Sequence, residues 1–297
     1  MNKIPVVFTF DKRIVLGAAV AIKSLIDCAN PDTEYDIYVY HPDIDDRTAE
    51  EFKKMVANSR HSITFEYINK NKFANAPINK GGSWTEIVYY RLLIPELLPQ
   101  YDKVLYADTD VLFKGDLSEV YNTDITDYEC GAVRMEPNND KMICHHYFPE
   151  NKNKWTYISS FILFNCKRMR EEHFVDRVFE TIKTFNTRLK FFDLDTLNIT
   201  CNDILDLPYR YGVFQSIYYN TDITKGREYE FLKNAYTIEE LEGEKQHTIM
   251  LHYAGHPGKP WRFKHIPKDY QECMDKIPKS LKRYTFRDIR KRLFSKV

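Results

Sequence analysis

The chain has 297 residues, enough for one large domain with a substantial core or for two small domains. It is 43% hydrophobic and 29% charged, as is usual for a soluble globular protein, and its formal net charge is zero. A nucleic-acid-binding protein would be expected to be basic throughout, so this charge argues against nucleic acid as a partner.

The first part of the chain alternates between strand and helix patterns. Residues 4–10 (IPVVFTF) are apolar and β-branched, as expected for a buried strand, and residues 16–29 carry apolar side chains at helical spacing. The next predicted elements are a strand at 35–41, a helix at 46–57 capped by Asp45 or Asp46, and a strand at 61–67. This alternation indicates a parallel sheet with crossover helices.

The rest of the chain predicts shorter elements. Residues 69–82 are polar and contain Pro77, Gly81 and Gly82, so we expect a loop there. The elements expected after it are a helix at 84–98, strands at 103–107, 129–134, 160–165 and 248–253, and a long amphipathic helix at 168–185. No repeat or linker divides the chain, and we predict one α/β domain over residues 1–267 followed by a C-terminal segment over 268–297.

Cysteine spacing and the lack of long apolar runs bear on location. The six cysteines contain no CxxC pair, which argues against a structural zinc site and favours reduced, buried thiols. Asp11, Lys12 and Arg13 interrupt the first apolar run too early for a signal peptide, and no run is long enough for a transmembrane helix. We therefore expect a protein that is cytoplasmic or held at a membrane surface. The basic C-terminal segment described below favours a peripheral position at the inner face of the cell membrane.

Two carboxylates, Asp108 and Asp110, directly follow the strand predicted at 103–107. Ligands of open α/β sheets bind at the carboxyl ends of strands, and hard oxygen ligands suit Mg²⁺ or Mn²⁺. The same Asp-x-Asp tripeptide occurs at 43–45 and 193–195, so its position after a strand, rather than its composition, distinguishes the one at 108–110. A solvated turn or a helix cap is the alternative for each of them.

Two motifs carry a resemblance to a known family. Residues 90–121 read YRLLIPELLPQYDKVLYADTDVLFKGDLSEVY, and His252-Tyr253-Ala254-Gly255 precedes Lys259-Pro260-Trp261. Both resemble glycosyltransferase family 8, to which glycogenin and bacterial lipooligosaccharide α-1,4-galactosyltransferases belong. The resemblance implies a GT-A fold with a Rossmann-like, mostly parallel central sheet flanked by helices. It also implies a UDP-sugar donor, Mn²⁺ or Mg²⁺, and retention of anomeric configuration.

The resemblance assigns three metal ligands, namely Asp108, Asp110 and His252. Without the motif, His252 would be read as a buried core histidine. Thr109 and Gly255 belong to the same two motifs and are expected in the nucleotide-sugar site.

The remaining binding residues also follow from the resemblance. Thr9, Phe10 and Asp11 end the first strand, where the family binds uridine, although Asp11 is equally suited to cap the next helix. Lys259 would hold the diphosphate, and its alternative is an ordinary surface lysine. Arg91 would lie near the donor sugar or phosphate, and its alternative is an ion pair on its own helix.

Residues 193–198 resemble the family's DQ-x-x-LN region at Asp193, Leu197 and Asn198. The resemblance implies that Asp193 and Asp195 are the candidate catalytic carboxylates, together with Arg91. Asp193 would bond the donor sugar, and Asp195 would act as a nucleophile or stabilise an ion pair, the alternative for both being helix capping. The chain departs from the family here. Leu194 stands where the family has Gln, residues 158–160 (ISS) replace Asn-Ala-Gly, and the gap from His252 to Lys259 is one residue longer. The departures suggest a different donor sugar or pose, or else weak or absent activity.

The C-terminal segment is strongly basic. Residues 276–297 contain nine Lys or Arg and one acid, so they carry about +8 and the rest of the chain about −8. Phe286, Ile289, Leu293 and Phe294 share one helical face, flanked by basic residues, which is typical of a helix lying on anionic lipid. The alternative is a helix packed on the domain with a solvated basic face.

We compare three functions, the second of which the sequence argues against. The first is transfer of a hexose, galactose or glucose, from a UDP-sugar to a saccharide acceptor such as a lipooligosaccharide or another lipid-linked surface glycan. The second, a sugar-phosphate nucleotidyltransferase, would need a glycine-rich loop after the first strand, where this chain has Phe10-Asp11-Lys12-Arg13. The third is a non-catalytic nucleotide-sugar or glycan-binding protein, which the departures leave open.

Overall fold

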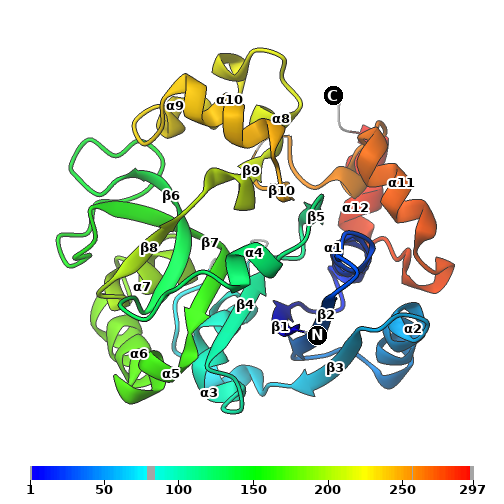
Figure 1. The fold of residues 1–297 in the computed structure, drawn as a ribbon, viewed down its shortest axis with the longest axis horizontal. Coiled ribbons are helices and arrows are strands. Elements are labelled where there is room, and N and C mark those ends of the chain that lie inside the picture. Colours follow the sequence, from blue (N-terminus) through cyan, green and yellow to red (C-terminus); the bar gives the residue numbers. More distant parts are fainter. Residues whose placement is uncertain (1, 79–83, 256, 295–297) are drawn as a thin grey trace.

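A seven-stranded sheet forms the centre of the protein, seen here in a computed structural model that describes residues 2–78, 84–255 and 257–294 (Figure 1). Its strand order is β3-β2-β1-β4-β7-β6-β8, and β7 alone among these strands runs antiparallel to its neighbours. The strands are β1 (Asn2–Thr9), β2 (Thr33–His41), β3 (Ser62–Tyr67), β4 (Lys103–Ala107), β6 (Cys130–Pro137), β7 (Trp155–Asn165) and β8 (Ile204–Leu207). The mostly parallel α/β architecture predicted from the sequence is confirmed.

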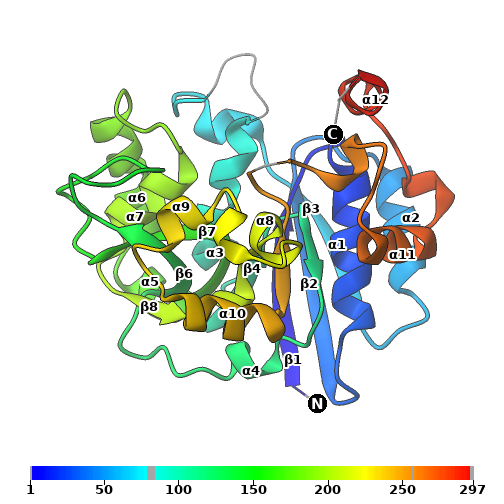
Figure 2. The same ribbon diagram turned by 90° about the horizontal axis from the view of Figure 1, so that it is seen from above.

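Helices cover both faces of this sheet (Figure 2). One face carries α1 (Val15–Asp27), α2 (Asp46–Val56) and α11 (Lys268–Lys276), and the other carries α3 (Ile94–Leu97), α5 (Cys166–Glu171), α6 (Phe174–Phe185) and α7 (Asp193–Thr200). Side chains along a strand point alternately to the two faces. Val6 and Phe8 accordingly join the core under α1, while Val7 joins the core on the opposite face.

A second, three-stranded sheet positions the two family motifs. It contains β5 (Val111–Phe113), β10 (Met250–His252) and β9 (Val213–Phe214), in that order. β5 begins directly after Asp110 and runs antiparallel to β10, so that Val111 pairs with His252. The backbone N–H of Tyr253 donates to the carbonyl of Asp110 at 2.8 Å. Strand pairing therefore brings together carboxylates and an imidazole that lie far apart in the sequence.

Five further helices of the described residues lie outside the two faces of the large sheet. They are α4 (Ser118–Tyr121), α8 (Gln215–Tyr218), α9 (Tyr229–Leu232), α10 (Ile238–Gln246) and α12 (Phe286–Phe294). Short 3-10 segments include Glu86–Leu93 and Pro260–Arg262.

Several predicted boundaries were wrong. The helix expected at 84–98 is a 3-10 segment over Glu86–Leu93 followed by the single α-turn of α3, since Pro95 has no N–H to give to the carbonyl four residues earlier. The helix expected at 168–185 is two helices, α5 and α6, separated at His173, which has a left-handed backbone with φ of 52°. The strands β6 and β7 are both longer than the predicted ranges 129–134 and 160–165. Part of the loop expected at 69–82, from residue 79 onward, lies outside the described residues.

The segment after residue 267 packs partly onto the domain. In α11, the Cys273 thiol donates to the carbonyl of Val20 in α1 at 3.6 Å, and the ring of Tyr270 stacks on Trp261. α12 differs, because Phe286, Leu293 and Phe294 in it are exposed. No helix among the described residues has the length and apolar character needed to cross a bilayer. All six cysteines are free, as predicted, but Cys28 and Cys144 are only half-buried.

Candidate functional site

A cavity of about 750 Å³ opens at the carboxyl ends of β1 and β4, where ligands of open α/β sheets bind. The predicted uridine-binding residues Thr9, Phe10 and Asp11 line it. The Phe10 ring itself belongs to the core, 5.7 Å from the ring of Phe52. Asp11 does not cap α1, because its carboxylate accepts the backbone N–H of Arg13 at 2.8 Å and pairs with the Arg13 guanidinium.

The predicted metal ligands converge at the edge of this cavity, where Asp108 and Asp110 line it and His252 lines a smaller, adjoining cavity. Asp108, Asp110 and His252 each offer a ligand atom, and these atoms all lie within 4.8 Å of one another. His252 Nε2 is 3.9 Å from Asp108 Oδ2 and 3.7 Å from Asp110 Oδ1. Thr109, between the two carboxylates, is buried and lines the same cavity.

The protonation of His252 suits a metal ligand. Burial lowers the pKa of His252 to about 4, so the imidazole is neutral near pH 7 even with Asp108 opposing the shift. Its Nδ1 atom is buried and has no hydrogen-bond partner among the described residues, and its ring stacks on Phe214 at 5.6 Å. Two carboxylates and a neutral imidazole form a donor set that fits Mn²⁺ or Mg²⁺.

The segment after His252 brings a cation to the same place. Lys259 contacts the carboxylate of Asp110 in an ion pair. Gly255 turns the chain with φ of +70°, and a Cβ built there would lie 1.9 Å from the Glu228 carboxylate, so only glycine fits.

Trp261 fixes this segment on the domain. It is 1% exposed and packs against Gly17 in α1, where an added Cβ would lie 2.6 Å from its ring. The position of Lys259 is therefore tied to the packing of Trp261, two residues further along.

A second cavity, of about 390 Å³, adjoins the first and shares Arg91, Asp108, Asp110 and Lys259 with it. Arg91 is 6% exposed and links two carboxylates here. Its Nη2 atom is 2.9 Å from Asp108 Oδ1, and its Nε atom is 3.3 Å from Asp193 Oδ2. Arg91 thus connects the metal-ligand group to the first turn of α7.

Further contacts hold this arginine in place. Arg91 donates to the carbonyls of Ser159 and Val88, and its guanidinium lies 4.4 Å from the centre of the Tyr106 ring. The Tyr106 hydroxyl donates to Asp108 at 2.7 Å. A buried cation with this many partners is rigid and fully paired. The alternative of an ion pair on its own helix is wrong, because both carboxylate partners lie on other elements and belong to the site.

The residues that depart from the family pattern line the smaller cavity. Leu194 and Ile158 present apolar side chains to it. The Ser159 hydroxyl donates to Asp193 at 2.8 Å. The Ser160 hydroxyl is buried without a hydrogen-bond partner among the described residues, an arrangement that a bound polar ligand would satisfy.

Asp195 is not brought together with the other predicted catalytic residues. It does not line the cavity, and its carboxylate accepts the backbone N–H groups of Lys190 and Phe191, each at 2.8 Å. These bonds stabilise the turn before α7, in which Phe192 has φ of 45°. Asp195 therefore shapes the turn that presents Asp193.

Sequence reasoning missed a buried group beside the smaller cavity. Glu136 accepts backbone N–H groups from Ile143, Cys144 and His145, and it contacts His145 Nδ1 at 3.0 Å. Cys144 and His145 line the cavity. Their segment has no periodicity or motif, and the only available signal was the His145-His146 pair after Cys144.

Comparison with known proteins agrees with this geometry. The sequence matches the family described as Glycosyl transferase family 8 over residues 5–265. It is 24% identical over 259 residues to the lipopolysaccharide 1,2-glucosyltransferase of Escherichia coli (strain K12), covering 86% of this chain and 72% of that protein. It is 25% identical over 266 residues to the lipopolysaccharide 1,3-galactosyltransferase of Salmonella typhimurium, with coverages of 88% and 73%.

Solved structures share the fold. The galactosyltransferase LgtC, in complex with donor and acceptor sugar analogues, superposes with a TM-score of 0.72 and 22% identity over 93% of this chain and 98% of that one. The bifunctional glycosyltransferase WbbM gives a TM-score of 0.76 and 22% identity over 98% of this chain and 52% of that one. The architecture is the GT-A fold of these enzymes. Since the family match spans most of the chain and includes both motifs that meet in the cavity, this protein belongs to glycosyltransferase family 8.

Proposed function

We propose that this chain is a retaining, metal-dependent transferase that moves a hexose, galactose or glucose, from a UDP-sugar to a saccharide acceptor on a lipid-linked surface glycan. The observation that carries the proposal is the convergence of Asp108, Asp110 and His252 within 4.8 Å where two adjoining cavities meet at the carboxyl ends of the parallel strands. The acceptor class is supported by relatives that are named as lipopolysaccharide glucosyl- and galactosyltransferases.

The cation held by these three residues would neutralise charge on the departing nucleoside diphosphate. Lys259 lies beside Asp110 and would add a second positive charge for the same oxygens. Arg91 would hold Asp108 and Asp193 in fixed positions through its ion pairs with both. The wider cavity would hold the nucleotide, with Thr9 and Asp11 on its wall.

Asp193 is the carboxylate proposed to face the donor sugar. It lines the smaller cavity, and Ser159 and Arg91 orient it. A fixed negative charge there would stabilise the positive charge that develops at the anomeric carbon. The two bonds from backbone N–H groups to Asp195 support a positioning role for that residue.

A second candidate function is binding of a nucleotide sugar without turnover. The observation that favours it is the apolar character of Leu194 and Ile158, which line the cavity where the family presents polar groups to the sugar. Every metal and diphosphate residue is nevertheless present, so we place transfer first.

We also propose that α12 docks on an anionic membrane surface, so that the enzyme is peripheral at the inner face of the cell membrane. Phe286, Leu293 and Phe294 are exposed, and Ile289 is partly exposed beside them. Arg290 and Lys291 flank this apolar face, a pattern suited to lipid headgroups.

The direct test of transfer is UDP release from a panel of UDP-sugars with Mn²⁺ and without acceptor. Asp110→Asn should abolish metal-dependent release, because it removes one ligand charge while keeping the side-chain shape. Asp45→Asn is the matched control, since Asp45 belongs to another Asp-x-Asp tripeptide and caps α2 at Thr48, a role that Asn also fills.

Each result decides between the two candidates. Release from one donor, lost with chelator and in Asp110→Asn but not in Asp45→Asn, supports transfer and identifies the sugar. Metal-dependent UDP binding without release, even with a deacylated lipopolysaccharide acceptor added, favours the binding protein. Absence of UDP binding contradicts both.

A further inference from the structure

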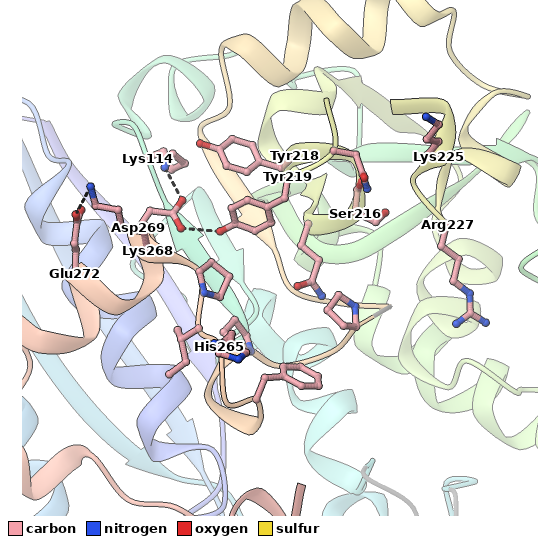
Figure 3. A pocket seen from close by; sticks show the side chains of 17 residues that line it. Lys114, Ser216, Tyr218, Tyr219, Lys225, Arg227, His265, Lys268, Asp269 and Glu272 are labelled. Carbon is pink, nitrogen blue, oxygen red and sulfur yellow. Dashed lines mark hydrogen bonds and ion pairs between the residues drawn. The ribbon is translucent and has the colours of Figure 1, made fainter. Parts of the chain in front are cut away.

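A third cavity, of about 880 Å³, lies outside the nucleotide and sugar cavities and shares no lining residue with them (Figure 3). One wall is α8 with the turn that follows it, and the other is the segment 257–267 with the first turn of α11. We call this cavity the basic groove. The residues that define it in the following argument are Lys114, Tyr218, Lys225, Arg227, Lys268 and Asp269.

Positive charge exceeds negative charge in the basic groove. Lys114 is neutralised by Asp269 at 3.0 Å, and Lys268 lies 3.8 Å from Glu272. Lys225 and Arg227 extend from the far side, away from α11 (Figure 3). Lys225 has Asp222 at 3.5 Å, whereas no carboxylate in the described part of the chain comes within ion-pair distance of Arg227. Two exposed cations thus line the outer edge of the groove with one nearby carboxylate, that of Asp222, between them.

Aromatic and polar side chains give the groove a fixed shape. Tyr218 is half-buried, and the Lys114 ammonium lies 5.1 Å from the centre of its ring. The Tyr219 hydroxyl is 2.7 Å from Asp269 and 2.9 Å from the Tyr253 hydroxyl. Rings held in this way offer a flat face for the apolar side of a sugar, while nearby guanidinium and ammonium groups suit phosphate or carboxylate oxygens.

One stretch of chain separates the basic groove from the sugar cavity. Ala254 and Gly255 line the sugar cavity, and Pro257 lines the groove. Gln215 in the groove wall donates to the carbonyls of Ala254 and Gly258, at 3.3 and 3.0 Å. An extended acceptor whose terminal sugar enters the cavity would therefore meet the groove after crossing this stretch.

We propose that the basic groove binds an anionic, phosphate-bearing saccharide segment of the acceptor, remote from the sugar that receives the new bond. The inference rests on the proposed function for the identity of the ligand as acceptor. The inference adds that the acceptor must carry negative charge, and that Lys225 and Arg227 are the main contacts of that charge. The groove holds the acceptor and takes no part in the chemical step.

The test measures binding rather than turnover. Deacylated lipopolysaccharide oligosaccharide from Escherichia coli, intact or dephosphorylated, is titrated into the full chain with UDP and Mn²⁺ in a calorimeter. The intact form should bind more tightly, and the Lys225→Ala/Arg227→Ala double variant should weaken its binding by about tenfold or more. Arg227→Lys should retain most of the affinity, and Lys183→Ala, which changes an exposed lysine on α6, should have no effect.

Parallel measurements separate the alternatives. UDP affinity should be equal in all these variants, because none of the altered residues lines the nucleotide cavity. Equal affinity for the intact and dephosphorylated forms, no binding of either, or an undiminished affinity in the double variant would overturn the proposal while leaving UDP binding intact. Inorganic phosphate that competes at the affinity of the oligosaccharide, or polyglutamate that binds as tightly, would also overturn it. Loss of UDP binding in the unaltered chain would instead contradict the proposed function.

Discussion

The Nε atom of Arg91 lies 3.3 Å from the carboxylate of Asp193, and both side chains are buried. Burial raises the pKa of Asp193 to about 6, although Arg91 and the Ser159 hydroxyl both act in the opposite direction. Protonation of Asp193 removes the charge that pairs with Arg91. We therefore expect metal-dependent UDP release to fall on acidification, with an apparent pKa near 6.

Ser159 provides the test of this assignment. Ser159→Ala removes a hydrogen bond that stabilises the ionised carboxylate, so the pKa of Asp193 should rise and the acidic limb should move to higher pH by roughly 0.5–1 unit. The measurement is a pH profile of UDP release for both proteins. An acidic limb at the same pH in both would exclude Asp193 as its origin.

Because Trp261 packs closely on α1, we expect a single methyl group added at Gly17 to affect both stability and UDP binding. In Gly17→Ala the new Cβ would lie 2.6 Å from the Trp261 ring and 3.0 Å from the carbonyl oxygen of Thr109, so one of them must shift. We expect a loss of about 1–3 kcal/mol in the free energy of unfolding and weaker UDP binding, because Lys259 lies two residues from Trp261.

Gly243→Ala is the control for this substitution. Nothing lies within 4 Å of a Cβ at Gly243, inside α10, and alanine there should stabilise the protein by about 0.5–1 kcal/mol. Urea denaturation and UDP titration of both variants give the comparison. Unchanged stability and UDP affinity in Gly17→Ala would contradict the proposed coupling.

The contact between Glu136 and His145 predicts pH-dependent stability. Burial alone lowers the pKa of His145, but its contacts with the Cys144 thiol and the Glu136 carboxylate prevail and raise the pKa to about 9. Because the pKa is higher in the folded than in the unfolded protein, this stabilisation is complete below about pH 6.5 and disappears as the pH rises through about 9. It amounts to at most about 3 kcal/mol.

The variant His145→Gln isolates this effect. The difference in unfolding free energy between the unaltered chain and His145→Gln should be largest near pH 6 and should shrink toward pH 9, as measured by urea denaturation across this range. A difference that is independent of pH would mean that His145 stabilises the fold through packing alone.

The exposed apolar face of α12 predicts binding to vesicles. The Leu293→Glu/Phe294→Glu double variant should lose sedimentation with vesicles containing anionic phosphatidylglycerol, while its UDP affinity is unchanged, since neither residue lines the nucleotide cavity. Added salt should weaken binding of the unaltered chain, because part of the attraction is electrostatic.

Ile238→Ser is the control for α12, because it removes an exposed apolar side chain from a different helix, α10. Equal sedimentation of the double variant and the unaltered chain would show that α12 does not contact lipid.

Local patterns predicted the parts of the fold and site that depend on neighbouring residues. The strand ending at Ala107 and the carboxylates after it could be recognised because a buried apolar run and polar ligands are adjacent in sequence. The break at His173 could not, since no glycine or proline marks the left-handed backbone there.

Contacts between distant segments were beyond sequence reasoning. The contact of Glu136 with the loop at 143–145 depends on how that loop folds back onto β6. The basic groove collects Lys114, which follows β5, and residues of α8 and α11, and no single stretch carries its signature. The sequence motif also gives no indication that the Asp195 carboxylate accepts the backbone N–H groups of residues 190 and 191. The turn-stabilising role of Asp195 could therefore not be predicted.

The start of α12 has a consequence for how membrane and donor affect each other. Thr285, Phe286 and Arg287 line the nucleotide cavity, and Asp288 pairs with Arg262 of the segment that carries Lys259. A lipid surface that holds α12 therefore also holds one wall of the donor site. The two effects must then be reciprocal. If UDP tightens vesicle binding by a given factor, vesicles must tighten UDP binding by the same factor. The bilayer would act as an effector of donor affinity as well as the place where the acceptor resides.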